Sequence, residues 1–402
     1  MVEEMAQAGY RALDALMFDA EAGAPEDVPL LAAKAASRMG LAEATIYLAD
    51  VQQDRLVPLP GAQPEPPALP IDGTLAGWCY RTSSVQTTEA EPTGLRVWIP
   101  MLDGVERVGV LGLRGDRLDA PRLRFCRSLA TLLTMIVLTK GSHSDNYTRL
   151  QRSAPMRLSA ELLWAFLPPR TLNARDVLCT AALEPAYEMG GDSFDHALVG
   201  SRMHATVLDA MGHDLRAGLT SAVALAGGRN ARRSGLGLGE LAESVDEILA
   251  AEFPTRYCTG VFVQLDLPTG ELEWVNCGHP VPLLIRGLRL VPGAFDRAPE
   301  LPLGFGALTG QRRAVHRLSL RPGDRVLLYT DGVTDARSSS GERFGLKNFT
   351  EFIIRATAAG EPAYETLRRL IHALLAHHDD RLTDDATIVL FEWRPERGAQ
   401  TS

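Results

Sequence analysis

Acidic residues stand beside apolar runs at four places in the C-terminal part of the chain, and their types and spacing suit metal chemistry. The stretch Glu188-Met-Gly-Gly-Asp192-Ser-Phe-Asp195 is followed closely by Asp209-Ala-Met-Gly-His213. Two later runs, Asp324-Arg-Val-Leu-Leu-Tyr-Thr-Asp331-Gly and Asp384-Asp-Ala-Thr-Ile-Val-Leu390, repeat the arrangement. Four strand ends that each carry an Asp predict a single metal site.

Small, hard cations such as Mg²⁺ and Mn²⁺ prefer oxygen ligands, and a pair of them needs several convergent Asp side chains. Water between two such ions is acidified to a hydroxide near neutral pH, and the ions offset charge on phosphoryl oxygens. No nucleophilic side chain is needed, which agrees with a chain that has no nucleophile elbow, CxxxxxR thiol site or Walker loop. The glycines of Gly235-Leu-Gly-Leu-Gly239 follow no strand and indicate a loop.

Each acidic residue also has a structural interpretation. An Asp beside Gly at a strand end is commonly a turn former or a helix cap, but four such sites in one domain favour the metal interpretation. His213 and His279 suit either proton transfer or phosphate binding, or else a structural hydrogen bond, and both interpretations stay open. Asp379 and Asp380 lie in a polar loop and are expected to be solvated surface.

Composition narrows the class of protein. A chain of 402 residues exceeds one ordinary core and predicts two domains. The net charge of -9 argues against nucleic-acid binding. The 5 cysteines are widely spaced and form no CxxC pair, which disfavours a disulfide framework or a zinc site and favours a reducing cytoplasm. No secretory leader is evident, and the most apolar run, residues 128–139, is too short to span a membrane.

The N-terminal part alternates helical and strand-like patterns. Apolar spacing predicts helices over 10–18 and 28–39, the second capped by Asp27, and a closing helix over 121–140. Residues 71–78 indicate a turn into a short helix. The expected strands cover residues 45–48, 55–59, 96–99 and 108–113. This order predicts an α+β module.

A connector follows. Gly141 to Asp145 is a polar linker, and helical spacing from Tyr147 to Phe166 is interrupted by Pro155, which predicts a helix in two parts. One face of the second part is apolar and needs a partner: Leu158, Leu162, Leu163 and Phe166. Packing within the chain and a homodimer seam with a second chain remain equal alternatives.

The C-terminal part, from about residue 177 to 393, begins with strands. Residues 260–275 form a hairpin around Pro268-Thr-Gly270, and residues 280–290 begin another. Helices are expected over 214–233, 238–251, 346–358 and 364–377. Antiparallel strands flanked by helices predict a layered α/β/β/α sandwich with antiparallel sheets, so the whole chain is expected to be of the α+β class.

Residues 10 to 140 resemble a GAF sensor domain. The resemblance rests on Ile71-Asp-Gly-Thr-Leu-Ala-Gly-Trp78 and on the hairpin Ile99-Pro-Met-Leu-Asp-Gly-Val-Glu-Arg-Val-Gly-Val-Leu-Gly-Leu113. It implies an α/β sensor with a small-molecule ligand, whose identity stays open because the sequence has no haem or bilin signature. Cys79 beside Trp78 suits a pocket, but a buried structural thiol is favoured because free Cys packs as a small hydrophobe.

The C-terminal part resembles the SpoIIE/RsbU branch of the PPM-type (protein phosphatase 2C-like) serine/threonine phosphatases. The motifs that carry the resemblance occur in family order over about 220 residues. They are Gly190-Gly-Asp192-Ser-Phe-Asp195, Asp209-Ala-Met-Gly-His213, Asn276-Cys-Gly-His279-Pro280, Leu303-Gly304, Tyr329-Thr-Asp331-Gly-Val-Thr-Asp335 and Asp384-Asp385-Ala-Thr387. The match is highly specific.

This resemblance implies two Mn²⁺ or Mg²⁺ ions. Asp209 would bridge them, Asp192 and the Ala210 carbonyl would complete one site, and Asp331 and Asp384 the other. Asp385 is expected to orient water or Asp384.

Two positions depart from the family pattern. Ala210 replaces a residue that is often Val or Gly, which a backbone ligand tolerates. Asp214 stands where Gly is usual and adds negative charge near the metals.

The implied substrate is a phosphoserine or phosphothreonine protein, a STAS-domain anti-anti-sigma factor of a bacterial partner-switching pathway. We expect residues 1–141 to be the GAF-like sensor, 142–172 the helical linker, 173–396 the phosphatase and 397–402 a tail. A homodimer is expected, without nucleic acid and without a membrane span.

Two rival functions remain. Gly190-Gly-Asp-Ser-Phe194 resembles the GGDEF signature of diguanylate cyclases, but Ser193 replaces the expected Glu, and the Asp331 and Asp384 blocks have no place in a cyclase. The second rival is a catalytically inactive signalling scaffold with a GAF module and a phosphatase fold. Retention of the acidic positions argues against it.

Overall fold

The computed structural model describes residues 2–61, 66–89, 94–116, 119–308, 310, 312–337, 341–377, 382 and 384–395. The chain divides into two compact units, Met1–Pro155 and Met156–Ser402, and each is considered by itself. The predicted linker, residues 142–172, spans this boundary. The pair Asp379-Asp380 and the predicted tail lie outside the described residues.

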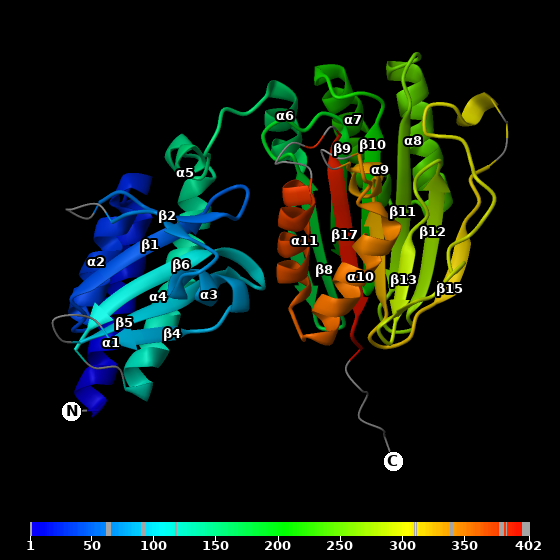
Figure 1. Cartoon of the computed structure of the whole chain (residues 1–402). Coiled ribbons are helices and arrows are strands. Elements are labelled where there is room, and N and C mark those ends of the chain that lie inside the picture. Colours follow the sequence, from blue (N-terminus) through cyan, green and yellow to red (C-terminus); the bar gives the residue numbers. More distant parts are fainter. Residues whose placement is uncertain are drawn as a thin grey trace. The chain divides into compact units, whose positions relative to one another are not determined.

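The N-terminal unit is built on one antiparallel sheet of six strands in the order β3-β2-β1-β6-β5-β4 (Figure 1). The strands are β1 (Glu43–Ala49), β2 (Arg55–Pro58), β3 (Leu69–Pro70), β4 (Gln86–Glu89), β5 (Leu95–Asp103) and β6 (Glu106–Gly115). The helices are α1 (Val2–Ala22), α2 (Val28–Arg38), α3 (Leu75–Thr82) and α4 (Ala120–Gly141). The strands and helices expected from the sequence are present, whereas β3 and β4 were not predicted because each is short.

The predicted cap of α2 is wrong in detail. Asp27 makes no side-chain cap bond to α2. Its Oδ2 instead accepts a hydrogen bond from the Ala24 N–H at 2.9 Å, which closes the short 3₁₀ turn Pro25–Asp27. Thr74, by contrast, caps α3 through a bond from the Gly77 N–H, as expected for an N-cap hydroxyl.

The space between α3 and the sheet is filled by large side chains. Tyr47 and Trp98 meet edge to face at 5.6 Å, and the Arg107 guanidinium lies over the Tyr80 ring at 4.5 Å. Cys79 is fully buried in this cluster, and burial raises the pKa of its thiol. The structural interpretation of Cys79 is therefore the better one. All five cysteines of the chain are buried, free thiols.

The connector is broken at Pro155, as predicted. It forms α5 (Asp145–Leu150) in the first unit and α6 (Leu158–Phe166) in the second. Leu163 is fully buried in the core of the second unit, while Leu158 is 65% exposed. Packing within the chain thus accounts for part of the apolar face of α6.

The C-terminal unit contains two antiparallel sheets, with strand orders β15-β12-β11-β10-β9 and β14-β13-β16-β17-β8-β7. The first sheet consists of β9 (Asp192–Val199), β10 (Arg202–Ala210), β11 (Cys258–Asp266), β12 (Glu271–Cys277) and β15 (His316–Ser319). The second consists of β7 (Thr171–Ala174), β8 (Val177–Glu184), β13 (Leu283–Arg286), β14 (Arg289–Leu290), β16 (Arg325–Tyr329) and β17 (Ala386–Trp393).

Helices cover the outer faces of the two sheets (Figure 1). The first sheet is covered by α7 (Leu215–Arg233) and α8 (Leu238–Glu252), and α6 packs against α7. The second sheet is covered by α10 (Gly345–Ala358) and α11 (Ala363–His377). The short helix α9 (Asp331–Asp335) follows β16. The predicted α/β/β/α sandwich is confirmed. Its core lies between the sheets, where Phe194, Trp274 and Phe391 are almost fully buried.

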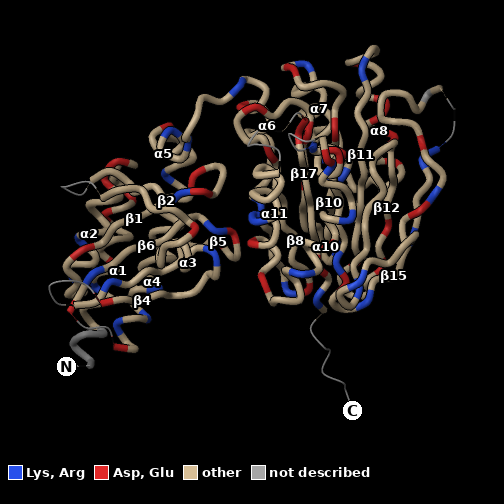
Figure 2. Tube along the Cα trace, viewed as in Figure 1, with Lys and Arg blue, Asp and Glu red and all other residues tan. Residues whose placement is uncertain are grey.

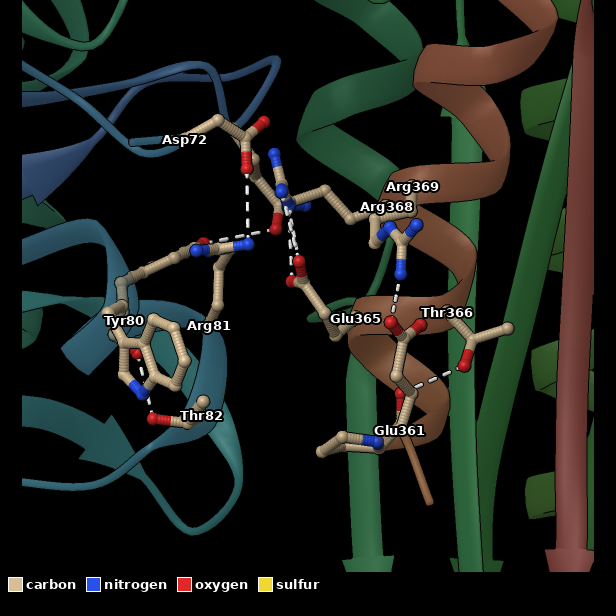
Figure 3. Close-up of polar contacts among 12 residues, drawn as sticks. Asp72, Tyr80, Arg81, Thr82, Glu361, Glu365, Thr366, Arg368 and Arg369 are labelled. Carbon is tan, nitrogen blue, oxygen red and sulfur yellow. Dashed lines mark hydrogen bonds and ion pairs between the residues drawn. The ribbon is translucent and has the colours of Figure 1, made fainter. Parts of the chain in front are cut away.

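Helix α11 has an apolar face and also carries charged side chains that form ion pairs. Figure 3 shows Glu365 beside Arg368, one helical turn apart, with 2.9 Å between Oε1 and Nη2, and Arg369 beside Glu361. In the other unit, Figure 3 shows Arg81 of α3 paired with Asp72 at 3.4 Å.

None of the helices in the described parts of the chain combines the length and the apolar character that a membrane crossing requires.

The sandwich core generates a stability prediction. Phe391→Ala removes a fully buried ring between the sheets and is expected to lower the free energy of unfolding by about 3 to 5 kcal/mol. Leu198→Ala, at a side chain that is 40% exposed near the end of β9, is expected to cost less than about 1 kcal/mol. Urea unfolding of the full chain, followed by tryptophan fluorescence, measures both. Equal losses would contradict this placement of the core.

Candidate metal centre

The acidic residues predicted from the sequence come together at one edge of the sandwich. Asp192 begins β9 and Asp209 lies near the end of β10, and the two are directly opposite in this antiparallel pair. In the other sheet, Asp331 follows β16 and Asp384 precedes β17, which are also antiparallel neighbours. The end of one strand and the start of its antiparallel partner share an edge. Figure 2 shows acidic residues gathered where β9, β10 and β17 meet.

The carboxylates at this edge influence one another. Burial, followed by the charges of Asp331, Asp384 and Asp385, raises the pKa of Asp209 to about 7. Burial and the charges of Asp209 and Asp385 raise the pKa of Asp192 well above its ordinary value. The pKa values of Asp331 and Asp384 are also raised, first by burial. A concentration of negative charge of this kind is typical of functional sites.

Two threonine hydroxyls hold the carboxylate of Asp192. Thr330 Oγ1 and Thr387 Oγ1 each donate a hydrogen bond of 2.7 Å to Asp192 Oδ2. All three residues are buried, with exposed fractions of 2% or less. Both threonines stand inside motifs that the sequence singled out, but nothing in their spacing indicated a contact with Asp192.

Asp385 holds the backbone just before Asp192. Its Oδ2 accepts hydrogen bonds from the N–H groups of Gly190, Gly191 and Asp192 at 2.7, 2.8 and 3.2 Å. The N–H of Asp385 also donates to Asp384 Oδ1 at 2.9 Å. Asp385 therefore contacts Asp384 through its backbone, while its side chain organises the glycine loop, a role that the sequence did not reveal.

Close backbone contacts explain the two glycines of this loop. A Cβ at Gly190 would overlap the backbone of His213, and a Cβ at Gly191 would overlap the carbonyl oxygen of Ala210. The Ala210 N–H in turn donates to the Gly191 carbonyl at 3.2 Å. The loop before β9 and the end of β10 are thus in direct contact, and only glycine fits at these two positions.

The two histidines have different environments. His213 is exposed at the end of the Asp209 motif. His279 is buried, its Nδ1 lies 3.0 Å from Thr259 Oγ1, and burial lowers its pKa to about 3. Asn276 bonds to both the N–H and the carbonyl of His279. The surroundings of His279 support the structural interpretation.

The unusual Asp214 has a clear structural role. Its Oδ1 accepts the Ala217 N–H at 2.9 Å and so caps α7, and its Oδ2 pairs with Arg256 at 3.2 Å. Arg256 also donates to the Met211 carbonyl at 2.9 Å. The added negative charge therefore has a cationic partner.

A buried ion pair beside the site was missed by sequence reasoning. Asp195 Oδ1 lies 2.6 Å from Arg229 Nη2, and Asp195 Oδ2 lies 2.8 Å from Arg232 Nη1. Both arginines belong to α7, so this contact ties the helix to β9. Helical spacing of Arg229 and Arg232 was a possible signal, but it does not identify the partner.

The donor set fits a hard divalent cation by its chemistry. In the described segments, no group of three or more His, Cys, Asp or Glu side chains is drawn together as closely as a metal ion would hold it. The acidic side chains and the Ala210 carbonyl nevertheless supply only oxygen ligands, which Mg²⁺ and Mn²⁺ prefer. Burial and the charges of neighbouring carboxylates together raise the pKa of Asp209, and a divalent cation would offset both effects.

Stacked antiparallel sheets faced by helices, with acidic residues at one edge, define a PPM-type (protein phosphatase 2C-like) domain. Residues 200–394 match the family model described as "Stage II sporulation protein E (SpoIIE)", so this part of the chain is similar to the SpoIIE-type PPM phosphatases.

Known proteins agree with this family. The "Phosphoserine phosphatase RsbP" of Bacillus subtilis is 26% identical over 211 residues, which cover 51% of this chain and 49% of that protein. "Protein IcfG" of Synechocystis is 28% identical over 134 residues, which cover 33% of this chain and 20% of that protein. The chain thus spans less than half the length of these curated relatives. The SiaA-PP2C domain of Pseudomonas aeruginosa has the same fold, with a TM-score of 0.50 and 18% identity over 58% of this chain and 94% of that domain.

The raised pKa of Asp209 generates a prediction about pH. A proton binds Asp209 more tightly in the metal-free folded chain than in the unfolded chain, whose Asp pKa is near 3.8. Protonation of Asp209 therefore makes its full contribution to the free energy of unfolding below pH 3.8, and this contribution is lost as the pH rises through about 7. Asp209→Asn is uncharged at every pH. Between acidic and neutral pH, we expect the free energy of unfolding of wild type to fall by roughly 1 to 3 kcal/mol relative to that of this variant.

Urea unfolding in EDTA at mildly acidic and neutral pH measures the difference. Asp296→Asn, at an exposed carboxylate, is the matched control and is expected to follow wild type. Parallel pH profiles for wild type and Asp209→Asn would contradict the prediction.

Proposed function

We propose that the chain is a metal-dependent protein serine/threonine phosphatase. The observation that carries the proposal is the convergence of Asp192, Asp209, Asp331 and Asp384 at one edge of a PPM sandwich. Asp209 would bridge two Mn²⁺ or Mg²⁺ ions, with Asp192 and the Ala210 carbonyl on one and Asp331 and Asp384 on the other. The bound ions supply an acidified water and offset charge on the phosphoryl oxygens.

The residues of the chain position this metal site. Thr330 and Thr387 hold Asp192, and Asp385 holds the loop that leads into it. The Arg256 contacts to Asp214 and to the Met211 carbonyl fix the turn after Asp209. Because Asp214 caps α7 and pairs with Arg256, it supplies no reason for an inactive site, and the scaffold alternative loses its main support.

We propose as substrate a phosphoserine or phosphothreonine protein, specifically a STAS-domain anti-anti-sigma factor. The match of residues 200–394 to the SpoIIE family model and the similarity to the phosphoserine phosphatase RsbP support the phosphoprotein class. The STAS partner follows from the resemblance to the SpoIIE/RsbU branch. A homodimer belongs to the same proposal, and Leu158 is an exposed apolar side chain that a second chain would cover.

We propose further that the N-terminal unit is a GAF-like sensor with a small-molecule ligand, and that the connector carries its signal. In the first unit, Tyr147 Oη donates to the Pro25 carbonyl at 2.6 Å, and Gln151 Nε2 donates to the Ala49 carbonyl at 2.8 Å. In the second, Ser159 Oγ donates to the Met189 carbonyl at 2.8 Å, one residue before the glycine loop. The connector thus has anchors in each unit.

The phosphatase proposal predicts metal-dependent phosphate release. Release from an aryl phosphate and from a phosphoserine STAS protein is expected with Mn²⁺ or Mg²⁺ and is expected to stop in EDTA. Asp209→Ala and Asp331→Ala are each expected to lower the rate at least about 100-fold, because metal-based charge stabilisation is removed. Asp296→Ala is the exposed control. If neither Mn²⁺ nor Mg²⁺ supports phosphate release, the proposal is refuted. Formation of a cyclic dinucleotide from GTP would establish the cyclase alternative.

The sensor proposal predicts that loosening the connector changes the rate. The double variant Tyr147→Phe, Gln151→Ala removes two side-chain anchors of the connector in the first unit. We expect phosphate release by the full chain to change at least about fivefold, since couplings between sites are usually of this size or larger. We expect the connector to affect the turnover rate and not metal binding. Mn²⁺ affinity, measured by calorimetry, should therefore equal that of wild type within error. An unchanged rate would refute this role of the connector.

A further inference from the structure

We propose that Thr330 and Thr387 are positioning residues that make Asp192 a ligand through one oxygen only. This inference rests on the proposed metal-dependent function and goes beyond it, because it assigns roles to two side chains outside the set of metal ligands.

The hydrogen bonds give the two oxygens of Asp192 different roles. Oδ2 accepts two hydroxyl bonds, each of 2.7 Å, from Thr330 and Thr387. Oδ1 accepts no hydrogen bond from any residue that the structure describes. Hydroxyl bonds to a carboxylate are short and strong compared with bonds between neutral groups. The rotation of the carboxylate is thereby fixed, and Oδ1 is the oxygen left for a cation.

The two threonines support each other. The Thr330 N–H donates to the Thr387 carbonyl at 3.0 Å, and the Thr387 N–H donates to Thr330 Oγ1 at 2.9 Å. Thr330 Oγ1 accepts this N–H, and its own hydrogen goes to Asp192 Oδ2 at 2.7 Å rather than to the Asp385 carbonyl, which is 3.4 Å away. The orientation of the first hydroxyl is thus set by the backbone of the second threonine.

The contact also joins the two sheets at the metal edge. Thr330 directly follows β16 and Thr387 lies in β17, both in one sheet, whereas Asp192 begins β9 in the other. In the proposed site, Asp192 and Asp209 come from one sheet, and Asp331 and Asp384 flank strands of the other. A hydrogen bond between the sheets at this point fixes the separation of the two ligand pairs. Groups that orient metal ligands commonly contribute 10- to 100-fold, roughly, to metal affinity.

Thr387→Val is the cleanest test, because valine keeps the shape of threonine and removes one hydroxyl donor. A methyl group cannot stay 2.7 Å from Oδ2, so the Asp192 carboxylate must move or turn. We expect Mn²⁺ to bind about 10- to 100-fold more weakly in calorimetry of the full chain. We expect Thr330→Val to weaken binding at least as much, since it also leaves the Thr387 N–H without its acceptor.

Serine variants and a remote threonine separate positioning from mere stability. Thr387→Ser keeps the hydroxyl and is expected to bind Mn²⁺ within about threefold of wild type, well below the loss of about 10- to 100-fold expected when a positioning group is removed. Thr180→Val is the matched control: Thr180 is 2% exposed in β8, and its Oγ1 lies 3.3 Å from Thr171 Oγ1 rather than near the metal edge. We expect it to alter the melting temperature without altering Mn²⁺ affinity.

The outcomes distinguish this inference from the function on which it rests. If Asp209→Ala loses Mn²⁺ while Thr387→Val and Thr330→Val bind it like wild type, the positioning role is refuted and the metal-dependent function stands. If Thr387→Ser binds as poorly as Thr387→Val, packing of the methyl group is responsible and the inference is also refuted. If wild type itself binds no Mn²⁺, the proposed function fails and the inference fails with it.

Discussion

The carboxylate of Asp385, with its bonds to three successive backbone N–H groups, makes the contact on which the proposed metal site depends. These bonds bend the chain through Gly190 and Gly191 into the start of β9, where Asp192 stands. The same loop lies against the carbonyl of Ala210, at the end of β10. Both the predicted carboxylate ligand and the predicted backbone ligand of one metal ion are therefore positioned by one side chain that comes from the other sheet. Burial of this group among N–H donors gives it a defined geometry.

The buried carboxylates of the proposed metal site lower the stability of the fold that surrounds them. Burial and mutual repulsion raise the pKa values of Asp192 and Asp209, so that keeping these groups ionised without a cation costs free energy. The sandwich tolerates this cost because an extensive apolar core lies between its sheets, with Phe194, Trp274 and Phe391 almost fully buried. Such local conflict between charge and stability is expected where a cation is to be bound.

The same physical reasoning relates the connector to the site. In the second unit, the α6 residues Ser159 and Trp164 donate to the carbonyls of Met189 and Ala186, on the segment that runs into the glycine loop. A displacement of α6 would therefore act first on the backbone that Asp385 holds. The Asp195 pair with Arg229 and Arg232 keeps α7 on β9 at the far end of that helix. The start of α7 is held through Asp214.

Local patterns in the sequence were sufficient for most of the elements. The helices α7, α8, α10 and α11 follow from apolar spacing, and the β11–β12 hairpin follows from its turn residues, because these signals depend on neighbours a few residues apart. The sandwich architecture and the gathering of the four Asp positions also followed, since antiparallel strands bring consecutive ends to one edge. Strand β3 was missed because it has only 2 residues, and β4 was missed because Gln86–Glu89 contains no apolar side chain.

Tertiary structure alone decided how these residues are held. The bonds from Thr330 and Thr387 to Asp192 join positions 138 and 195 residues apart, and the bond from Gly190 to Asp385 again spans 195 residues. Residue type and spacing along the chain determine which groups are able to bind a metal ion. The partners that orient those groups come from distant strands, whose register is set by packing of the whole core.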